Sequence, residues 1–190
     1  MFMNQVINGC YYHSFIYKIE RMVNMKVYVV MCSYQKRIEK TGEERSGSIY
    51  RPGFMFLSEF DTKTQRYARY TLVPLKYEYI AQVIAENLIA KNSRIVVWSE
   101  DEKTILYTLL KEAGFDSGKL KFIPIKRYFK EHGIPYNSLA STAKELRLGT
   151  CPRDGVTSFD KVFERFDMLR RIFKKIIVID GLNLIDGILI

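Results

Sequence analysis

A strand–helix–strand pattern in the middle of the chain constrains the fold most. RIVVW at 94–98 is a short, continuous apolar segment of the kind that is buried inside a sheet. It runs into Ser99-Glu-Asp-Glu102, where Ser99 and Glu102 form a capping-box pattern, so we expect a helix from there to Gly114. KLKFIPI at 119–125 then predicts another strand. Consecutive strands joined by a helix pair in parallel, so the sequence predicts an α/β domain.

The region before this pattern predicts antiparallel strands. Segments dense in β-branched and aromatic residues lie at 26–34, 53–61 and 66–73. The polar segment 36–48 between the first two predicts an exposed loop, and DTKTQ between the last two has hairpin length. We therefore expect a three-stranded antiparallel meander whose edges are marked by Pro52 and Pro74.

The remaining segments predict helices, except at the C-terminal end. Apolar residues at helical spacing predict an amphipathic helix over 76–90 and further helices between 126 and 175. The apolar segment IIVIDGLNLIDGILI at 176–190 predicts a strand, or a hairpin around Asp180-Gly181. The expected partition is an N-terminal extension at 1–24, one domain at 25–175 and a C-terminal strand or hairpin at 176–190.

Charge and composition limit the partners of the chain. The 190 residues carry a formal net charge of +9, and residues 115–175 hold 14 basic against 7 acidic side chains. A basic excess favours a nucleic-acid partner, although a solvated basic face is the alternative. No apolar run approaches the length of a membrane span, and three widely spaced cysteines predict a reduced, cytoplasmic protein.

Two segments carry a resemblance to a known family. RIVVWSEDEKTILYTLLKEAGF resembles the segment of the DnaQ-like (DEDD) 3′–5′ exonucleases in which a strand ends in Trp or His and an Asp precedes a helix. FIPIKRYFKEHGIPYNSLASTAKELRLG is similar to the strand and helices that follow in that family. The resemblance covers residues 26–175. It implies a ribonuclease-H-like mixed sheet, with an antiparallel three-strand meander plus parallel strands and flanking helices.

The same resemblance implies a metal site, and this sequence matches only part of it. The family hydrolyses phosphodiesters with two divalent ions, Mg²⁺ or Mn²⁺, held by about four acids. Asp101 takes the place of the second metal-binding acid, although an acid in the first turn of a helix also complements the helix dipole. The first strand should supply Asp-x-Glu on one face, but VVMCSYQ offers Met31 and Ser33 at the corresponding places.

The last family motif is also incomplete. It places His or Tyr four or five residues before an Asp on the final helix, where Asp160 and Asp167 are available as candidate catalytic acids. Gly155 and Val162 stand five residues before them, so the general base is missing. Asp160 and Asp167 also belong to a polar helix face opposite a Phe-rich stripe, which favours a solvated surface.

Basic and aromatic residues suggest where a nucleic acid would bind. RYARY at 66–70 alternates Arg and Tyr on an expected strand, a pattern on which unpaired bases stack while guanidinium groups meet phosphates. The candidate nucleic-acid-binding residues are Arg66, Tyr67, Arg69, Lys126 and Arg127. An ordinary exposed edge strand accounts for RYARY equally well.

Three further patterns are weaker. Cys10-x-x-His13 would need His132 and Cys151 from far downstream to complete a zinc site. Glu59-x-Asp61 imitates the acidic motif, but its position favours a charge pair at the end of a hairpin. IIVIDGLNLID resembles the opening strand of NYN/PIN-type nucleases over about ten residues.

The sequence thus predicts a nucleic-acid-associated DnaQ-like domain that is a degenerate exonuclease, a pseudoenzyme serving as a binding or scaffold module. The first alternative is an active metal-dependent 3′–5′ exonuclease with atypical ligands. The second is a protein-interaction or oligomerisation module that binds through the C-terminal strand and has no nucleic-acid partner.

Overall fold

The fold is described by a computed structural model for residues 26–41, 45–74, 93–112, 114, 116, 120–133 and 136–180. The extension at 1–24, the helix expected at 76–90 and the last residues, 181–190, lie outside the described residues. Cys10 and His13 of the suggested zinc site lie outside them too.

The described part is built on one mixed sheet of six strands. The strands are β1 (Val27–Thr41), β2 (Arg45–Asp61), β3 (Arg66–Tyr67), β4 (Thr71–Pro74), β5 (Arg94–Val97) and β6 (Lys121–Pro124). They follow the order β3-β2-β1-β5-β6, and β4 also pairs with β2. β2 is antiparallel to β1, β3 and β4, whereas β1, β5 and β6 are parallel. The antiparallel meander joined to parallel strands is therefore confirmed.

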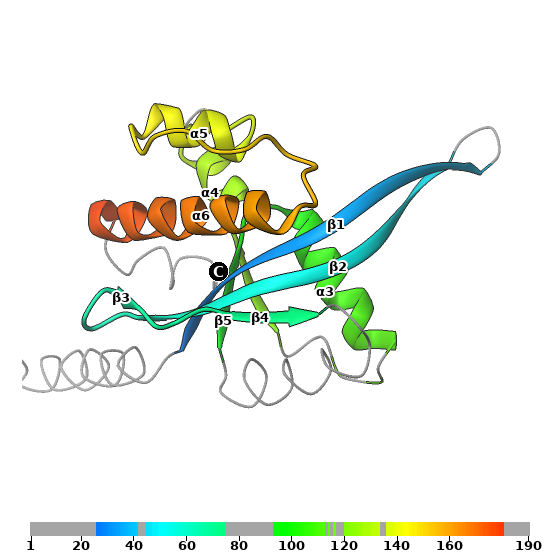
Figure 1. The fold of residues 1–190 in the computed structure, drawn as a ribbon, viewed down its shortest axis with the longest axis horizontal. Coiled ribbons are helices and arrows are strands. Elements are labelled where there is room, and N and C mark those ends of the chain that lie inside the picture. Colours follow the sequence, from blue (N-terminus) through cyan, green and yellow to red (C-terminus); the bar gives the residue numbers. More distant parts are fainter. Residues whose placement is uncertain are drawn as a thin grey trace, which may run out of the picture.

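The β1–β2 pair is much longer than the sequence predicted. The segment 36–48, expected as a loop, continues both strands, and their pairing runs out to Thr41 opposite Arg45. Figure 1 shows this arm projecting away from the helices. Pro52 was expected at an edge but lies inside β2 opposite Tyr34, where the register shifts. Pro52 has no N–H to donate, and it lies directly beside this interruption of the ladder, where prolines are tolerated.

The third expected strand is divided in two. β3 and β4 both pair with β2, and residues 68–70 between them belong to no strand. This break matters because it separates the two halves of RYARY: Tyr67 stays in the ladder and Tyr70 leaves it.

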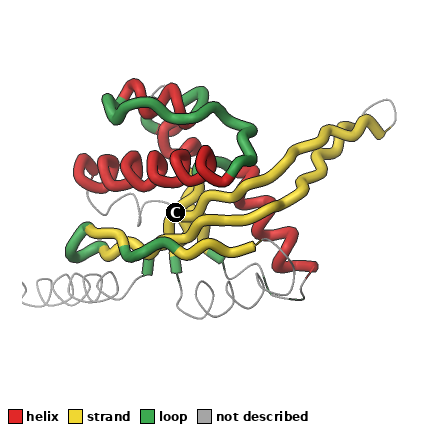
Figure 2. Tube along the Cα trace, viewed as in Figure 1, coloured by secondary structure: helices red, strands yellow, loops and turns green. Residues whose placement is uncertain are grey.

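Helices cover both faces of the sheet (Figure 2). α3 (Glu100–Glu112) packs on one face, and α6 (Phe159–Asp180) crosses the other, with α4 (Ile125–Glu131) and α5 (Leu139–Glu145) beyond it. Gly114 follows α3 with φ of 78°, a left-handed conformation that glycine adopts without strain. No described helix is both long and apolar enough to cross a membrane.

The end of α6 corrects one prediction. Residues 176–180 are helical, where the apolar run at 176–190 predicted a strand or hairpin. Ile176 and Ile177 are buried and continue the stripe of Ile172 and Phe173 at helical spacing. Packing of this stripe on the sheet overrides the β-propensity of the Ile-rich run. The domain boundary expected after 175 therefore falls inside a helix.

Two apolar clusters hold the layers together. Alternate β1 residues point to opposite faces: Val27, Val29 and Met31 pack beneath α6, and Tyr28, Val30 and Cys32 pack against α3. The cluster beneath α6 contains five fully buried aromatic or large apolar side chains from three elements, namely Phe56, Phe60, Phe129, Phe166 and Phe173.

Candidate functional site

A cavity of about 150 Å³ lies where β1, α3 and α6 converge. The lining residues come from the middle of β1, the β5–α3 junction, the start of α4, the loop before α6 and the first turns of α6. They are Met31, Cys32, Tyr34, Trp98, Ser99, Asp101, Glu102, Lys126, Asp154, Gly155, Val156, Val162 and Arg165. The backbone N–H of Lys126 donates to Trp98 O at 3.0 Å, which holds the start of α4 beside the end of β5.

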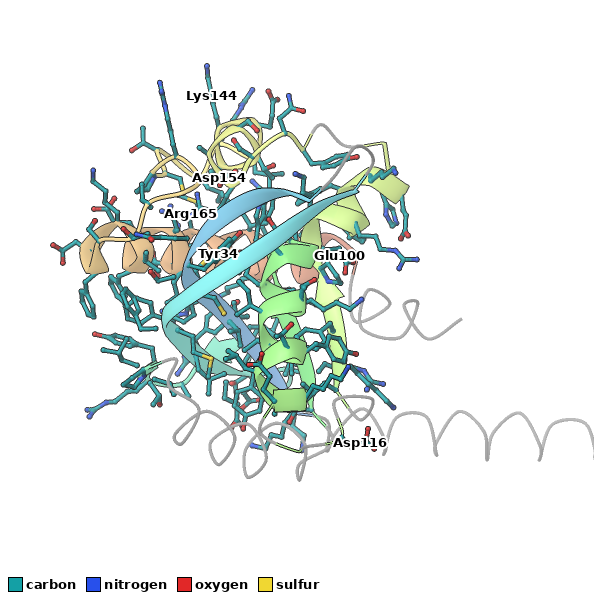
Figure 3. All side chains as sticks on the ribbon, turned by 90° about the vertical axis from the view of Figure 1, so that its right-hand side faces the viewer. Tyr34, Glu100, Asp116, Lys144, Asp154 and Arg165 are labelled. Atoms are coloured by element: carbon teal, nitrogen blue, oxygen red, sulfur yellow. The ribbon has the colours of Figure 1, made fainter. Side chains whose placement is uncertain are left out.

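Arg165 brings a positive charge into this cavity from α6. Its side chain is only 8% exposed, and its Nη1 donates to Pro152 O at 3.1 Å and pairs with Asp154 Oδ1 at 2.5 Å. Figure 3 looks at this end of the molecule, with Asp154 and Arg165 close together and Tyr34 nearby. Ser33 Oγ donates to Thr157 O at 3.4 Å. These contacts fasten the loop before α6 to both α6 and β1.

Glu102 places a buried carboxyl in the same cavity. It is 2% exposed and accepts hydrogen bonds from Ser99 N at 3.0 Å and from Ser99 Oγ. The half of the expected capping box in which the Glu102 carboxylate caps the Ser99 N–H is therefore present. Burial raises the pKa of Glu102, and the Ser99 hydrogen bonds and the Arg165 charge oppose that rise. Burial also raises the pKa of Cys32 well above its ordinary value, and the Glu102 charge adds to the rise. The Cys32 thiol is therefore kept neutral and unreactive.

Asp101 lies at the rim of the cavity in the first turn of α3. Tyr34 OH donates to Asp101 Oδ2 at 3.4 Å. Burial is the largest cause of a raised pKa at Tyr34, followed by the charges of Glu102 and Asp101. Asp101 is thus the one sequence-predicted acid among the residues that line the cavity.

Asp160 and Asp167 do not meet Asp101. Successive residues of a helix are about 100° apart around its axis, so Asp160 lies about 200° and Asp167 about 140° from Val162, which lines the cavity. Asp160 is exposed, and Asp167 pairs with Arg170 at 3.5 Å. Their suggested catalytic role stays a prediction, and the structure does not bring them into the cavity with Asp101.

The donor set of the cavity does not fit two divalent ions. Met31 and Ser33 face α6 at the positions where Asp-x-Glu would supply carboxylates, and both are buried. Of the three acids present, Glu102 caps α3 and Asp154 pairs with Arg165. Within the described ranges, no cluster of three or more His, Cys, Asp or Glu side chains could hold a metal ion.

The RYARY segment is used in two different ways. Tyr67 OH donates to Arg170 O at 2.7 Å, and the Arg170 guanidinium lies 4.3 Å from the Tyr67 ring centroid. Burial raises the pKa of Tyr67, which agrees with its anchoring of β3 to α6. Arg66 and Arg69 are exposed on either side of it. β3 pairs with the end of β2 that lies opposite the start of β1, so Arg66 is about eight residues, or about 26 Å, along the sheet from Tyr34.

The remaining candidates for nucleic-acid or zinc binding do not form one cluster. Lys126 lines the cavity, whereas Arg127 is exposed and pairs with Glu131 at 2.8 Å. His132 Nδ1 lies 2.9 Å from Tyr128 O, and Cys151 is a free, half-buried thiol whose pKa is raised by burial to about 11.

Local contacts account for Glu59 and Asp61, the pair that imitates the acidic motif in the sequence. Glu59 is paired with Lys26 and accepts from Tyr28 OH at 3.2 Å. Asp61 accepts from Lys63 N at 2.8 Å, and backbone hydrogen bonds are the largest cause of its lowered pKa. Both acids sit at the hairpin end of β2, as the sequence favoured, and neither lines the cavity.

Solved structures similar to this chain identify its fold. No family model and no curated protein matches the sequence. Several solved structures match, among them two with 10% and 9% sequence identity. The first, described as “3′-end specific recognition of histone mRNA stem-loop by 3′-exonuclease”, matches at a TM-score of 0.54 over 81% of this chain and 82% of its own. The second is “the nuclease domain of 3′hExo, a DEDDh family member, bound to rAMP”, with a TM-score of 0.53 over 82% and 92%.

The chain has the ribonuclease-H-like fold of DEDDh exonuclease domains. This confirms the fold implied by the resemblance. The resemblance in the sequence implied acids on β1, at the start of α3 and on the last helix. The cavity lies where β1, α3 and α6 meet.

Sequence reasoning missed Arg165, the residue that most changes the chemistry of the cavity. A signal was available, because Arg165 lies three residues after Val162 and one before Phe166, inside the apolar stripe of the last helix. A charged residue at that spacing must point toward the sheet. Its partner Asp154 lies in an irregular loop, where periodicity gives no information.

Proposed function

We propose that this chain is a nucleic-acid-associated DnaQ-like domain that binds single-stranded nucleic acid without hydrolysing it and serves as a binding or scaffold module. The observation that carries the proposal is the buried guanidinium of Arg165 in the cavity, combined with Met31 and Ser33 in place of acids on β1. A divalent ion about 5 Å from that guanidinium would be repelled by roughly 7 kcal/mol at an effective dielectric constant of about 20. Three acids line the cavity, but Glu102 caps α3 and Asp154 already pairs with Arg165.

Binding of nucleic acid is supported by charge and by the fold. The formal net charge of +9 favours a polyanion. The two matching structures are described with a histone mRNA stem-loop and with rAMP. Lys126 at the cavity and the exposed Arg66 and Arg69 are the candidate phosphate contacts.

An exonuclease assay with a metal titration tests the loss of hydrolysis. End-labelled single-stranded DNA and RNA are incubated with the purified chain and Mn²⁺ or Mg²⁺, and we expect the oligonucleotides to stay intact. Calorimetric titration with Mn²⁺ is expected to show no paired metal binding. In parallel, anisotropy with the same oligonucleotides in EDTA is expected to show binding that weakens steeply with salt.

The position of Asp101 favours a second candidate function, an active exonuclease with atypical ligands that uses Mg²⁺ or Mn²⁺. The discriminating variant is Asp101→Ala, and Asp116→Ala is a control at an exposed acid outside the cavity. Metal-dependent degradation that is abolished by Asp101→Ala and kept by Asp116→Ala would establish the exonuclease and overturn our proposal. Asp160→Ala and Asp167→Ala, assayed alongside, test whether either acid contributes.

A further inference from the structure

Three exposed hydrophobic side chains gather on the α6 side of the sheet. Tyr70, Leu72 and Phe159 are 45%, 43% and 45% exposed. Leu72 of β4 lies opposite Phe56 of β2. The rings of Tyr70 and Phe159 contact Phe56 from two directions, at centroid distances of 5.7 and 5.2 Å. We call the surface formed by Tyr70, Leu72 and Phe159 the aromatic ledge.

Packing from beneath holds the two rings of the aromatic ledge in place. Tyr70 lies 4.9 Å from the Phe163 ring, and Phe159 lies 5.9 Å from the Phe54 ring. Each ring therefore touches two other aromatic rings and still exposes almost half of its surface. Rings that are already held lose little conformational entropy when a flat ligand stacks on them.

The aromatic ledge lies close to the candidate cavity. Phe56 pairs with Met31, which lines the cavity, and Leu72 pairs with Phe56, so the ledge is two strand spacings or about 10 Å from β1. This places the ledge on the same face of the sheet as the cavity. A ligand strand that enters the cavity can reach the ledge without crossing the sheet.

One exposed basic residue adjoins the rings in the chain, because Arg69 directly precedes Tyr70. Lys161 is also exposed, but it lies about 200° around α6 from Phe159 and lines a hollow with Cys151 and Glu164 instead. Aromatic faces beside cations are the combination that binds unpaired bases, because every base offers a π-face and each linkage carries a phosphate.

From these observations we infer that Tyr70 and Phe159 are a stacking platform for the unpaired bases of single-stranded nucleic acid, with Arg69 contacting its phosphates. The inference rests on the proposed function and names the surface that performs it. It also moves the stacking role from Tyr67, whose hydroxyl and ring are engaged by α6, to Tyr70 at the other end of RYARY.

Replacement of each ring by leucine tests the platform. Tyr70→Leu and Phe159→Leu keep apolar bulk against Phe56 but remove the π-face, whereas Tyr70→Phe and Phe159→Tyr keep it. Affinity for a labelled single-stranded oligonucleotide is measured by anisotropy in EDTA. We expect each leucine variant to bind about 5- to 100-fold more weakly, and the conservative variants to bind like the wild type.

Two matched controls identify the interaction. Leu72→Ala removes an equally exposed aliphatic side chain of the same ledge and is expected to change affinity by less than about twofold. An oligonucleotide with abasic sites keeps the phosphates but has no bases to stack. Wild type and leucine variants are expected to bind it equally weakly. Urea unfolding of each variant verifies that it is folded.

The possible results separate this inference from the proposed function. If the wild type binds no oligonucleotide, the proposed function fails and takes the platform with it. If the wild type binds but the leucine variants bind equally well, only the platform is refuted. A loss in Leu72→Ala as large as in Tyr70→Leu would instead show that apolar contact area, and not ring stacking, carries the binding, and would also overturn the inference.

Discussion

Replacing Arg165 with methionine tests whether this guanidinium is the internal cation of the cavity. Methionine keeps most of the apolar volume against Val162 and Phe166 but removes the charge and the donors. The hydrogen bond from Arg165 to Pro152 O at 3.1 Å is lost, which costs about 1.5–3 kcal/mol for a charged donor. Because Asp154 is 52% exposed, loss of the ion pair adds less than about 1 kcal/mol. The variant should therefore lose about 2–4 kcal/mol of unfolding free energy at neutral pH.

Part of this loss should depend on pH through Glu102. The unfolded carboxyl ionises near its ordinary pKa of 4.5, whereas burial raises the pKa in the native state. The contribution of Glu102 to stability is thus greatest below about pH 4.5 and falls as pH rises through the native pKa. Without Arg165 the native pKa of Glu102 rises further. Each further unit of pKa costs about 1.4 kcal/mol of stability at a pH above the native pKa. The destabilisation should be larger at about pH 7.5 than at about pH 4.5.

Urea unfolding followed by the fluorescence of Trp98, the only tryptophan, measures this difference. Asp154→Asn is the matched control, because it removes the ion pair and leaves Arg165 in the cavity. In a Glu102→Gln background, Arg165→Met should cost about 1–2 kcal/mol less at neutral pH. An equal cost at both pH values and in both backgrounds would refute the reasoning, since Arg165 would then not compensate Glu102.

Three further changes test single contacts. Tyr67→Phe removes the hydroxyl that anchors β3 to α6 and should lower the unfolding free energy by about 1 kcal/mol, measured in urea, without weakening oligonucleotide binding. Ser99→Ala removes the hydroxyl partner of Glu102 at the start of α3 and should cost about 1 kcal/mol in the same assay. The pKa of Tyr28 is raised to about 12 by burial and by Glu59, so stability should fall as pH rises from 10 toward 12. Glu59→Gln should lower that pKa in a spectrophotometric titration.

The sequence predicted the parallel half of the fold because the evidence there is local. RIVVW, the Ser99–Glu102 cap and Gly114 each specify an element by themselves, and the structure contains all three. It did not predict the β1–β2 arm, because residues 36–48 are polar and charged and have no apolar alternation. Backbone pairing between the two strands forms the arm, and a single sequence does not reveal pairing partners.

Site prediction failed where tertiary contacts decide which side chain faces inward. Asp101 was found because it follows a strand and starts a helix, a purely local signal. Tyr67 and Tyr70 look equivalent in RYARY, and only the break at 68–70 places one against α6 and leaves the other exposed. The Ile-rich run at 176–180 was assigned to a strand from propensity alone, although burial of Ile176 and Ile177 continues the period of α6.

The contacts around the cavity explain what holds β1, the loop before α6 and α6 together in a chain whose β1 lacks the expected Asp-x-Glu pair for binding a metal ion. Carboxylates from several elements repel one another unless a cation lies between them. Here Arg165 supplies the cation, Asp154 and Pro152 O accept from it, and Ser33 fastens the same loop to β1. The link between β1, the loop and α6 is thus made by side chains of the chain itself. This closed arrangement is the structural basis of our proposal that the chain binds a ligand on the surrounding surface and performs no hydrolysis in the cavity.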